Sequence, residues 1–462
     1  MLSLLSQPGA SHDEFAFHAP SIWCARGIKP PACTDVRDLG SDKVLYASTN
    51  LDGEPCKSDR SGIHLCPNET AGSTLSNDGL YPGGFYFILS FFVIADPEMS
   101  LVLTRVVSAL IVTSALLLLM LLLPTKLQLA LCLTIVTSLP ATGYFLFSSI
   151  NPSSWTALGV GVGWLALHGV TTASSLTATN KIQLIALGLL IWGMAIVSRP
   201  DALLFVAFTC VLVLASRIST PLHHVMRNFS VATTITTLVL ILALSVVSRW
   251  NTLEEVTSDL LSPNKGIDGD LNLTSYLIDV MPQMLIALGS IPTHSAMLVP
   301  SVVFVINFAV YICLFVQASN WTNRWQVLGL FAVLLAGTLA MASQHVLLLN
   351  EATGNESRYL FPLFVFGTCW WYTNAPESLS ERAVSFLRPA TVAITISFGL
   401  TAYAIAERFA DRQSDRLRLI PEGPDNWWWD FVPVGPNVVV ILSTVFMWLF
   451  LRGLTDLAHQ ET

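Results

Sequence analysis

The feature that most constrains this chain is a set of apolar runs longer than a soluble domain uses. The run LVLTRVVSALIVTSALLLLMLLLP, which begins at Leu101, exceeds the roughly 20 apolar residues that a helix needs to cross a bilayer. Only 12% of the 462 residues are charged, about half the share in soluble proteins. The sequence therefore predicts an all-α integral membrane protein, a polytopic helical bundle.

Hydropathy windows predict about eleven spanning helices. They cover residues 97–123, 128–149, 154–172, 182–198, 201–216, 230–248, 296–317, 325–348, 359–372, 390–406 and 438–451. Two more apolar stretches, 81–96 and 274–292, are too short or are broken by Pro282. We expect both to be interfacial or re-entrant helices at the outer leaflet, because neither can cross it alone.

Basic residues predict the orientation, because short cytoplasmic loops are rich in Lys and Arg. They mark one alternate set of turns and the tail: Lys126, Lys181, Arg217, Arg227, Arg324, Arg382, Arg388 and Arg452. We therefore expect a multi-pass protein of the plasma membrane with a cytoplasmic C-terminus. Residues 1–96 form an extracytoplasmic first loop with a juxtamembrane helix, and residues 97–462 form a transmembrane domain with outer loops at 249–295 and 407–436.

This orientation exports the first loop with no span ahead of it. A helix upstream of Met1 would resolve the difficulty, and we expect one, which would give about twelve spans.

The first loop also holds Cys24, Cys33, Cys56 and Cys66. In an oxidising compartment they predict disulfides, with Cys24–Cys33 and Cys56–Cys66 the favoured pairing, although the other pairings stay open. A zinc site is the alternative, but the loop has no C-x-x-C spacing.

Several short motifs carry a resemblance. They are SHDEFAFHAPSIWCARG, YPGGFY, LTRVVSALI, NPSSW, SRPDALL and ESRYLFPLFVF. In these the chain resembles the bacterial membrane proteins of domain-of-unknown-function family 2142, most closely the actinobacterial members. That family in turn resembles integral-membrane glycosyltransferases of the C-type (GT-C) fold. The resemblance implies an inverting transferase that moves a sugar from polyprenyl phosphate to a cell-envelope glycan or glycolipid at the outer face of the membrane.

The resemblance also implies roles for the acidic doublet of the first loop. Asp13 is expected to act as general base on the acceptor hydroxyl, and Glu14 to support it or orient the acceptor. His18 lies four residues after Glu14, so on a helix the two would share a face and could pair or hold a divalent cation. The alternative is that these are ordinary solvated loop residues.

Three arginines are candidates for the donor phosphate. Arg105 lies within a span, where a guanidinium is costly unless it faces a polar partner. It could instead snorkel to the interface, or pair with a carboxylate for a purely structural purpose. Arg199 and Arg358 lie at outer helix ends. Arg199 could form a local ion pair with Asp201, and Arg358 could be an interface anchor. Asn151, in NPSSW, is expected to be a structural helix cap.

There are two weaker candidates for contact with the substrate. His345, near an outer helix end, could reach the same cavity or be an ordinary packing residue. The DNWWWD run at 425–430 could stack on a sugar ring but is typical of an interface anchor. The second hypothesis for function is non-catalytic, namely a transporter, flippase or scaffold for envelope precursors. Transporters usually carry ionisable residues near the midplane, whereas here the polar groups gather at the outer face. The expected partners are the lipid-linked donor, the acceptor and membrane lipids, and no basic stripe indicates nucleic acid.

Overall fold

The computed structural model describes residues 22, 82–94, 97–173, 176–199, 201–218, 273–291, 297–298, 300–320, 323–347, 357–410 and 435–460. This part of the chain is helical except for two short strands that pair antiparallel, β1 (Ser290–Ile291) and β2 (Met297–Leu298). The helices are α3 (Gly83–Ser90), α4 (Pro97–Leu122), α5 (Thr125–Ser138), α6 (Thr142–Ser148), α7 (Pro152–Leu158), the π-helix η4 (Gly159–Gly163), α8 (Trp164–Thr172), α9 (Ala178–Ile196), α10 (Ala202–Ile218), α14 (Leu273–Ile286), α15 (Ser301–Gln317), α16 (Arg324–Leu347), α17 (Ser357–Thr373), α18 (Glu377–Ala410) and α19 (Pro436–Gln460).

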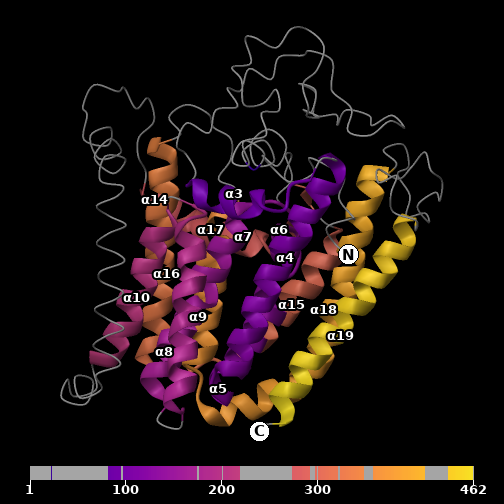
Figure 1. Ribbon diagram of the computed structural model, residues 1–462. Coiled ribbons are helices and arrows are strands. Elements are labelled where there is room, and N and C mark those ends of the chain that lie inside the picture. Colours follow the sequence, from indigo (N-terminus) through magenta and orange to yellow (C-terminus); the bar gives the residue numbers. More distant parts are fainter. Residues whose placement is uncertain are drawn as a thin grey trace.

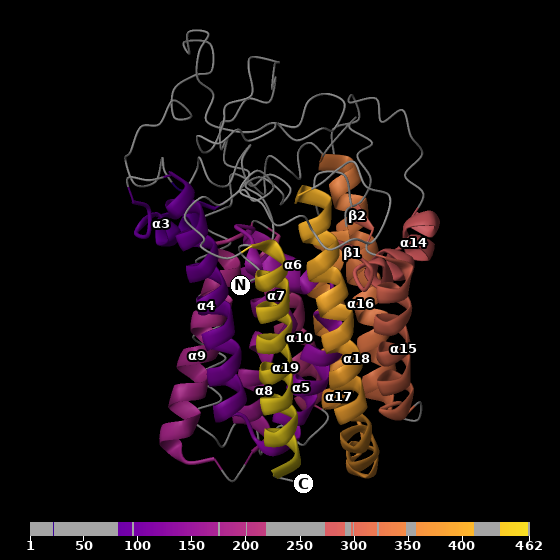
Figure 2. The same ribbon diagram turned by 90° about the vertical axis from the view of Figure 1, so that its right-hand side faces the viewer.

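The long helices run side by side and form one bundle (Figure 1). Helix α17 packs against α5, α16 and η4, while α18 packs against α15 and α19. The short elements α3, α6, α14 and the β1–β2 pair lie toward one end, and α19 ends at the other (Figure 2). We call these the upper and the lower end. Apolar side chains such as Leu121, Ile182 and Phe331 are each 67% exposed on the outside, as expected for helices whose solvent is lipid.

Five described helices are long and apolar enough to cross a membrane, or six if α5 and α6 count as one bent span. Ten of the predicted spans coincide with described helical segments, and the window 230–248 lies outside the described residues. The total of about eleven spans therefore stays a prediction. Several windows are shorter or interrupted as helices: α15, for example, begins only at Ser301, directly after Pro300.

One predicted span, 128–149, is wrong as a single helix. The chain turns by 97° between α5 and α6, and Pro140 lies in this break. Proline cannot donate a helical hydrogen bond and restricts the residue before it, so α5 ends there. Ala141 then adopts φ 56°, and the Thr142 amide donates to the Ala287 carbonyl at 3.4 Å, next to α14.

The backbone at Ala141 leads to a prediction. A positive φ favours glycine, because a Cβ atom crowds the backbone there. Ala141→Gly should therefore leave the melting temperature unchanged or raise it. Ala130→Gly removes the same methyl group from an equally buried position inside α5 and should lower stability by about 1 kcal/mol. Thermal unfolding of both purified variants in detergent checks this. If both variants lose the same stability, the backbone at Ala141 is not strained.

The segment 154–172, in contrast, forms one continuous helical path through α7, η4 and α8. The π-helical turn has the sequence GVGVG. A Cβ atom on Gly159 would lie 2.4 Å from the Ala195 Cβ, and one on Gly161 would lie 2.5 Å from the Val365 Cγ1. The glycines therefore let this path press closely between α9 and α17, as small residues do in membrane helix pairs.

At the lower end, a network of hydrogen bonds around Gln326 joins α16 to α17 and to the end of α15. Its side-chain amide donates to the carbonyls of Ala318 and Trp371, each at 2.9 Å, and accepts from the Asn320 amide at 2.8 Å. The Trp370 indole donates to the Trp325 carbonyl.

Helices α5, α9 and α16 all begin at this end, and Lys126, Lys181 and Arg324 lie in their first turns. The basic turns thus share one end, as predicted; that this end is cytoplasmic stays a prediction.

Candidate functional site

Helix α3, from the YPGGFY motif, lies across the upper end of the bundle (Figure 1). The Phe85 amide donates to the Val197 carbonyl at 3.1 Å, just past the end of α9. The Phe85 ring meets the Trp155 ring of α7 edge to face, with centroids 4.8 Å apart. A Cβ atom on Gly84 would come within 2.6 Å of the Val197 Cβ. Glycine at this position therefore lets α3 sit directly on the ends of α7 and α9.

Asn151 caps α7, as predicted. Its backbone is extended, Pro152 occupies the first turn, and its Oδ1 accepts from the Ser153 amide at 2.9 Å. The side chain is buried, and its Nδ2 atom has no hydrogen-bond partner in the part of the chain that the structure describes. The cap thus uses one half of the amide and leaves the other half unused.

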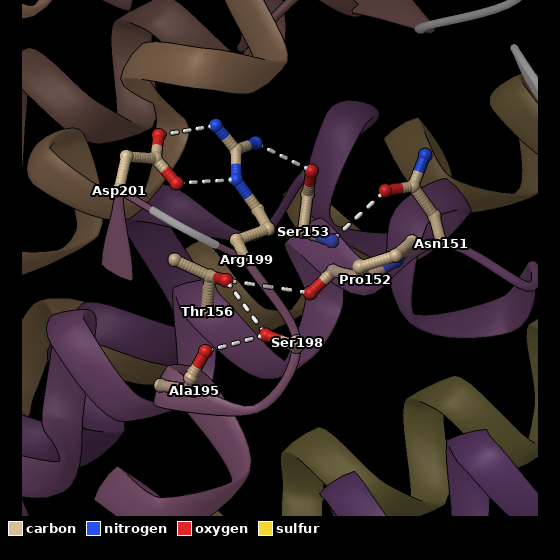
Figure 3. A network of polar contacts seen from close by, with 8 residues as sticks. All are labelled: Asn151, Pro152, Ser153, Thr156, Ala195, Ser198, Arg199 and Asp201. Carbon is tan, nitrogen blue, oxygen red and sulfur yellow. Dashed lines mark hydrogen bonds and ion pairs between the residues drawn. The ribbon is translucent and has the colours of Figure 1, made fainter. Parts of the chain in front are cut away.

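Arg199 lies in the turn between α9 and α10, beside Ser153 in the first turn of α7 (Figure 3). Its Nε donates to Asp201 Oδ1 at 2.8 Å, its Nη2 donates to Asp201 Oδ2, and its Nη1 donates to Ser153 Oγ at 2.8 Å. The guanidinium also lies over the Tyr359 ring, 4.7 Å from its centroid. The ion pair with Asp201, one of the two expectations for Arg199, is confirmed. We call Arg199, Asp201, Ser153 and Tyr359 the arginine clamp.

A second polar contact lies directly below the arginine clamp. The Ser198 and Thr156 hydroxyls are 2.9 Å apart, and Ser198 also donates to the Ala195 carbonyl at 2.7 Å (Figure 3). These hydroxyls join α7 to the turn between α9 and α10. Together with the arginine clamp, these hydroxyl contacts join the SRPD turn to NPSSW.

Arg105 lies on the inward face of α4 and is fully buried. The same face carries Ser100, Thr104 and Ser108, all buried. Ser108 Oγ accepts from the Trp155 indole at 3.3 Å, which joins α4 to α7. The interface alternative, in which Arg105 snorkels out of the bundle, is wrong, because the side chain has no exposed surface.

The structure therefore brings together five of the six motifs, from α3, α4, α7, the α9–α10 turn and α17. Sequence reasoning had not selected Ser153, Trp155, Ser108 or Tyr359. Each lies inside a quoted motif, so their only signal was proximity to the selected residues. Of the described buried side chains, only Arg105 and Arg199 carry a fixed charge.

Other predicted residues have no described side chain. Asp13, Glu14, His18 and the four loop cysteines lie outside the described residues, as does DNWWWD. Arg358 belongs to the first turn of α17 and His345 to the end of α16, but only their backbone is described. Cys132, Cys210, Cys313 and Cys369 are unpaired in their helices. Among the described residues no group of His, Cys, Asp and Glu could hold a metal ion.

The chain matches a known family of membrane proteins. The model of the family described as predicted membrane protein DUF2142 matches residues 1–367. No curated protein and no solved structure matches the chain. The matched range includes the five motifs that meet at the upper end.

Proposed function

The chain belongs to the DUF2142 family of predicted membrane proteins, and on that premise we propose that it is an inverting glycosyltransferase of GT-C-like architecture. Its donor is a polyprenyl-phosphate sugar, and its acceptor is a cell-envelope glycan or glycolipid at the outer face of the plasma membrane. One observation carries the proposal: Arg105 and Arg199, the described buried side chains of fixed charge, lie in motifs that meet at one end of an apolar bundle.

Arg105 is the residue we assign to the donor phosphate. A buried guanidinium within a membrane helix is costly unless it serves an anionic or polar partner. Arginine binds phosphate through two parallel hydrogen bonds. Arg199 has a different part, because the arginine clamp already engages its Nε and both Nη atoms. It positions α7, α10 and α17 around the phosphate and does not itself bind the donor.

In the proposed reaction the acceptor hydroxyl attacks the anomeric carbon of the donor sugar. Asp13 takes the hydroxyl proton as the new glycosidic bond forms. The bond between the anomeric carbon and the phosphate oxygen breaks, and polyprenyl phosphate leaves with the electron pair. Arg105 stabilises the negative charge that grows on this phosphate. Glu14 and His18 orient the acceptor or hold a divalent cation.

A transporter is the less supported function. It would need ionisable side chains near the bilayer midplane, facing a path through the protein. The two described buried arginines instead lie in the half of the bundle next to α3. This arrangement favours chemistry at one face over passage across the membrane.

The acidic doublet gives the test. Asp13→Asn should lower sugar transfer by about 100-fold or more, because the acceptor loses its general base. Transfer is measured with the purified full chain in lipid nanodiscs, with radiolabelled polyprenyl-phosphate sugars and cell-envelope extract as acceptor. Asp38→Asn, which changes another acid of the same segment, is the matched control and should transfer at the original rate. Equal rates for the two variants would remove Asp13 from the mechanism.

A further inference from the structure

The packing of α4 against α7 places two donor groups at one level. Both helices begin at the upper end, so they run in the same direction (Figure 1). The hydrogen bond from the Trp155 indole to Ser108 Oγ fixes their register. Arg105 lies three residues before Ser108, and Asn151 lies four residues before Trp155.

Residues three or four apart share one face of a helix, about one turn from each other. Arg105 is therefore about one turn above Ser108 on the face of α4 that meets α7. Asn151 is the cap residue directly before α7 and lies about one turn above Trp155. The hydrogen bond between Ser108 and Trp155 therefore places Arg105 and Asn151 at about the same level of the bundle, on two helices that pack together.

The Asn151 amide has an unused donor at this place. Its Oδ1 caps α7, while Nδ2 is buried and has no hydrogen-bond partner among the described residues. Ser or Asp would cap the helix as well as Asn, and neither would bury an unpaired N–H. A buried donor left unpaired is uncommon in native proteins and calls for an explanation. A ligand oxygen supplies one.

We propose that Asn151 Nδ2 and the Arg105 guanidinium together bind one oxyanion, the phosphate of a polyprenyl-phosphate donor. This inference rests on the proposed function and adds Asn151 as a second binding residue. The guanidinium supplies the charge and two N–H groups, and the amide supplies a neutral N–H from a second helix. Because the two donors come from different helices, they fix both the position and the orientation of the phosphate.

Two substitutions separate ligand binding from capping. Asn151→Ser and Asn151→Asp both keep an oxygen that can accept from the Ser153 amide. Asp removes the donor altogether, and Ser replaces the N–H donor with a hydroxyl on a side chain that is shorter by one heavy atom. The probe is polyprenyl phosphate without a sugar, bound to the purified full chain in nanodiscs. Asn151→Ser should weaken binding about ten-fold, the weight of one hydrogen bond to a charged group. Asn151→Asp should weaken it further, because its carboxylate repels the phosphate.

Thr177→Asp is the control, since it also exchanges a cap residue and adds the same charge. Thr177 caps α9 through its Oγ1, which accepts from the Asn180 amide at 3.2 Å. This variant should bind polyprenyl phosphate like the unmodified protein. Melting temperatures of all variants should stay close together, which shows that the cap is kept.

Three outcomes decide the matter. Binding that weakens in both Asn151 variants supports the inference, and a parallel arm with inorganic phosphate then shows whether the lipid tail is needed. If only inorganic phosphate binds, and does so through Asn151, the oxyanion site stands while the lipid-linked donor of the proposed function fails. If polyprenyl phosphate binds equally well to both variants and the unmodified protein, the inference is wrong and the proposed function survives.

Discussion

Gly159→Ala should destabilise the folded protein by about 3 kcal/mol, at the upper end of what overpacking a core usually costs. The added Cβ would lie 2.4 Å from the Ala195 Cβ and 3.0 Å from the Ile191 carbonyl oxygen. Neither group can rotate away, because one is bonded to the backbone and the other belongs to it. Relief therefore needs α7 and η4 to move away from α9, which would also separate the NPSSW and SRPD motifs.

Gly193→Ala provides the matched control on the neighbouring helix. A Cβ atom at Gly193 would have no heavy atom within 4 Å, and alanine favours a helix over glycine by about 1 kcal/mol. This variant should keep or raise the melting temperature. Thermal unfolding of both variants in detergent, followed by gel filtration, measures the difference. Similar melting curves would show that η4 and α9 are less tightly packed than these distances require.

The second large effect is expected at the arginine clamp. Asp201→Asn should lower stability by about 3 kcal/mol, because it removes the carboxylate from a guanidinium that is 4% exposed. The carboxylate itself is 29% exposed, so Arg199→Gln, which leaves Asp201 closer to solvent, should cost less. Asp201 directly precedes α10. Asparagine also caps helices well, and the lost interaction of a charge with the helix dipole is worth only about 0.3–1 kcal/mol, so most of the loss comes from the guanidinium.

A double-variant cycle isolates the pair. Arg199→Gln with Asp201→Asn should be more stable than the two separate losses predict, because neither charge is then left without the other. The coupling should be about 1–3 kcal/mol, measured by thermal unfolding in detergent. Strictly additive losses would mean that Ser153 and Tyr359, and not Asp201, stabilise Arg199.

The sequence alone predicted those features of the fold that depend on nearby residues. Hydropathy windows located the apolar helices, because burial in lipid depends on some 20 consecutive side chains. The Asn151–Pro152 pair predicted a helix start, since a cap bonds to an amide two residues away. Arg199 and Asp201 are two residues apart, so their ion pair was one of two stated alternatives. Hydropathy did not predict the break at Pro140, because averaging over a window hides one residue.

The candidate site was predicted only as a collection of residues. The sequence selected Arg105, Arg199 and Asn151 but gave no distance between them, because they belong to different helices. Ser153 and Tyr359 are far apart in the chain, and nothing local indicates that both contact the same guanidinium. The partners of Arg199 became visible only when α7, the α9–α10 turn and α17 were seen together.

The sequence by itself therefore determined that this is a multi-helix membrane protein, where most of its helices lie, and which end of the helices is basic. Apolar runs and short basic turns are sufficient for that, since each is a property of a short segment. The tertiary structure decided that five distant motifs meet at one end and that α4 packs against α7, with a hydrogen bond between Ser108 and Trp155. The physical reason is that such contacts depend on how whole helices pack, and close packing at glycines such as Gly159 is a property of two helices together.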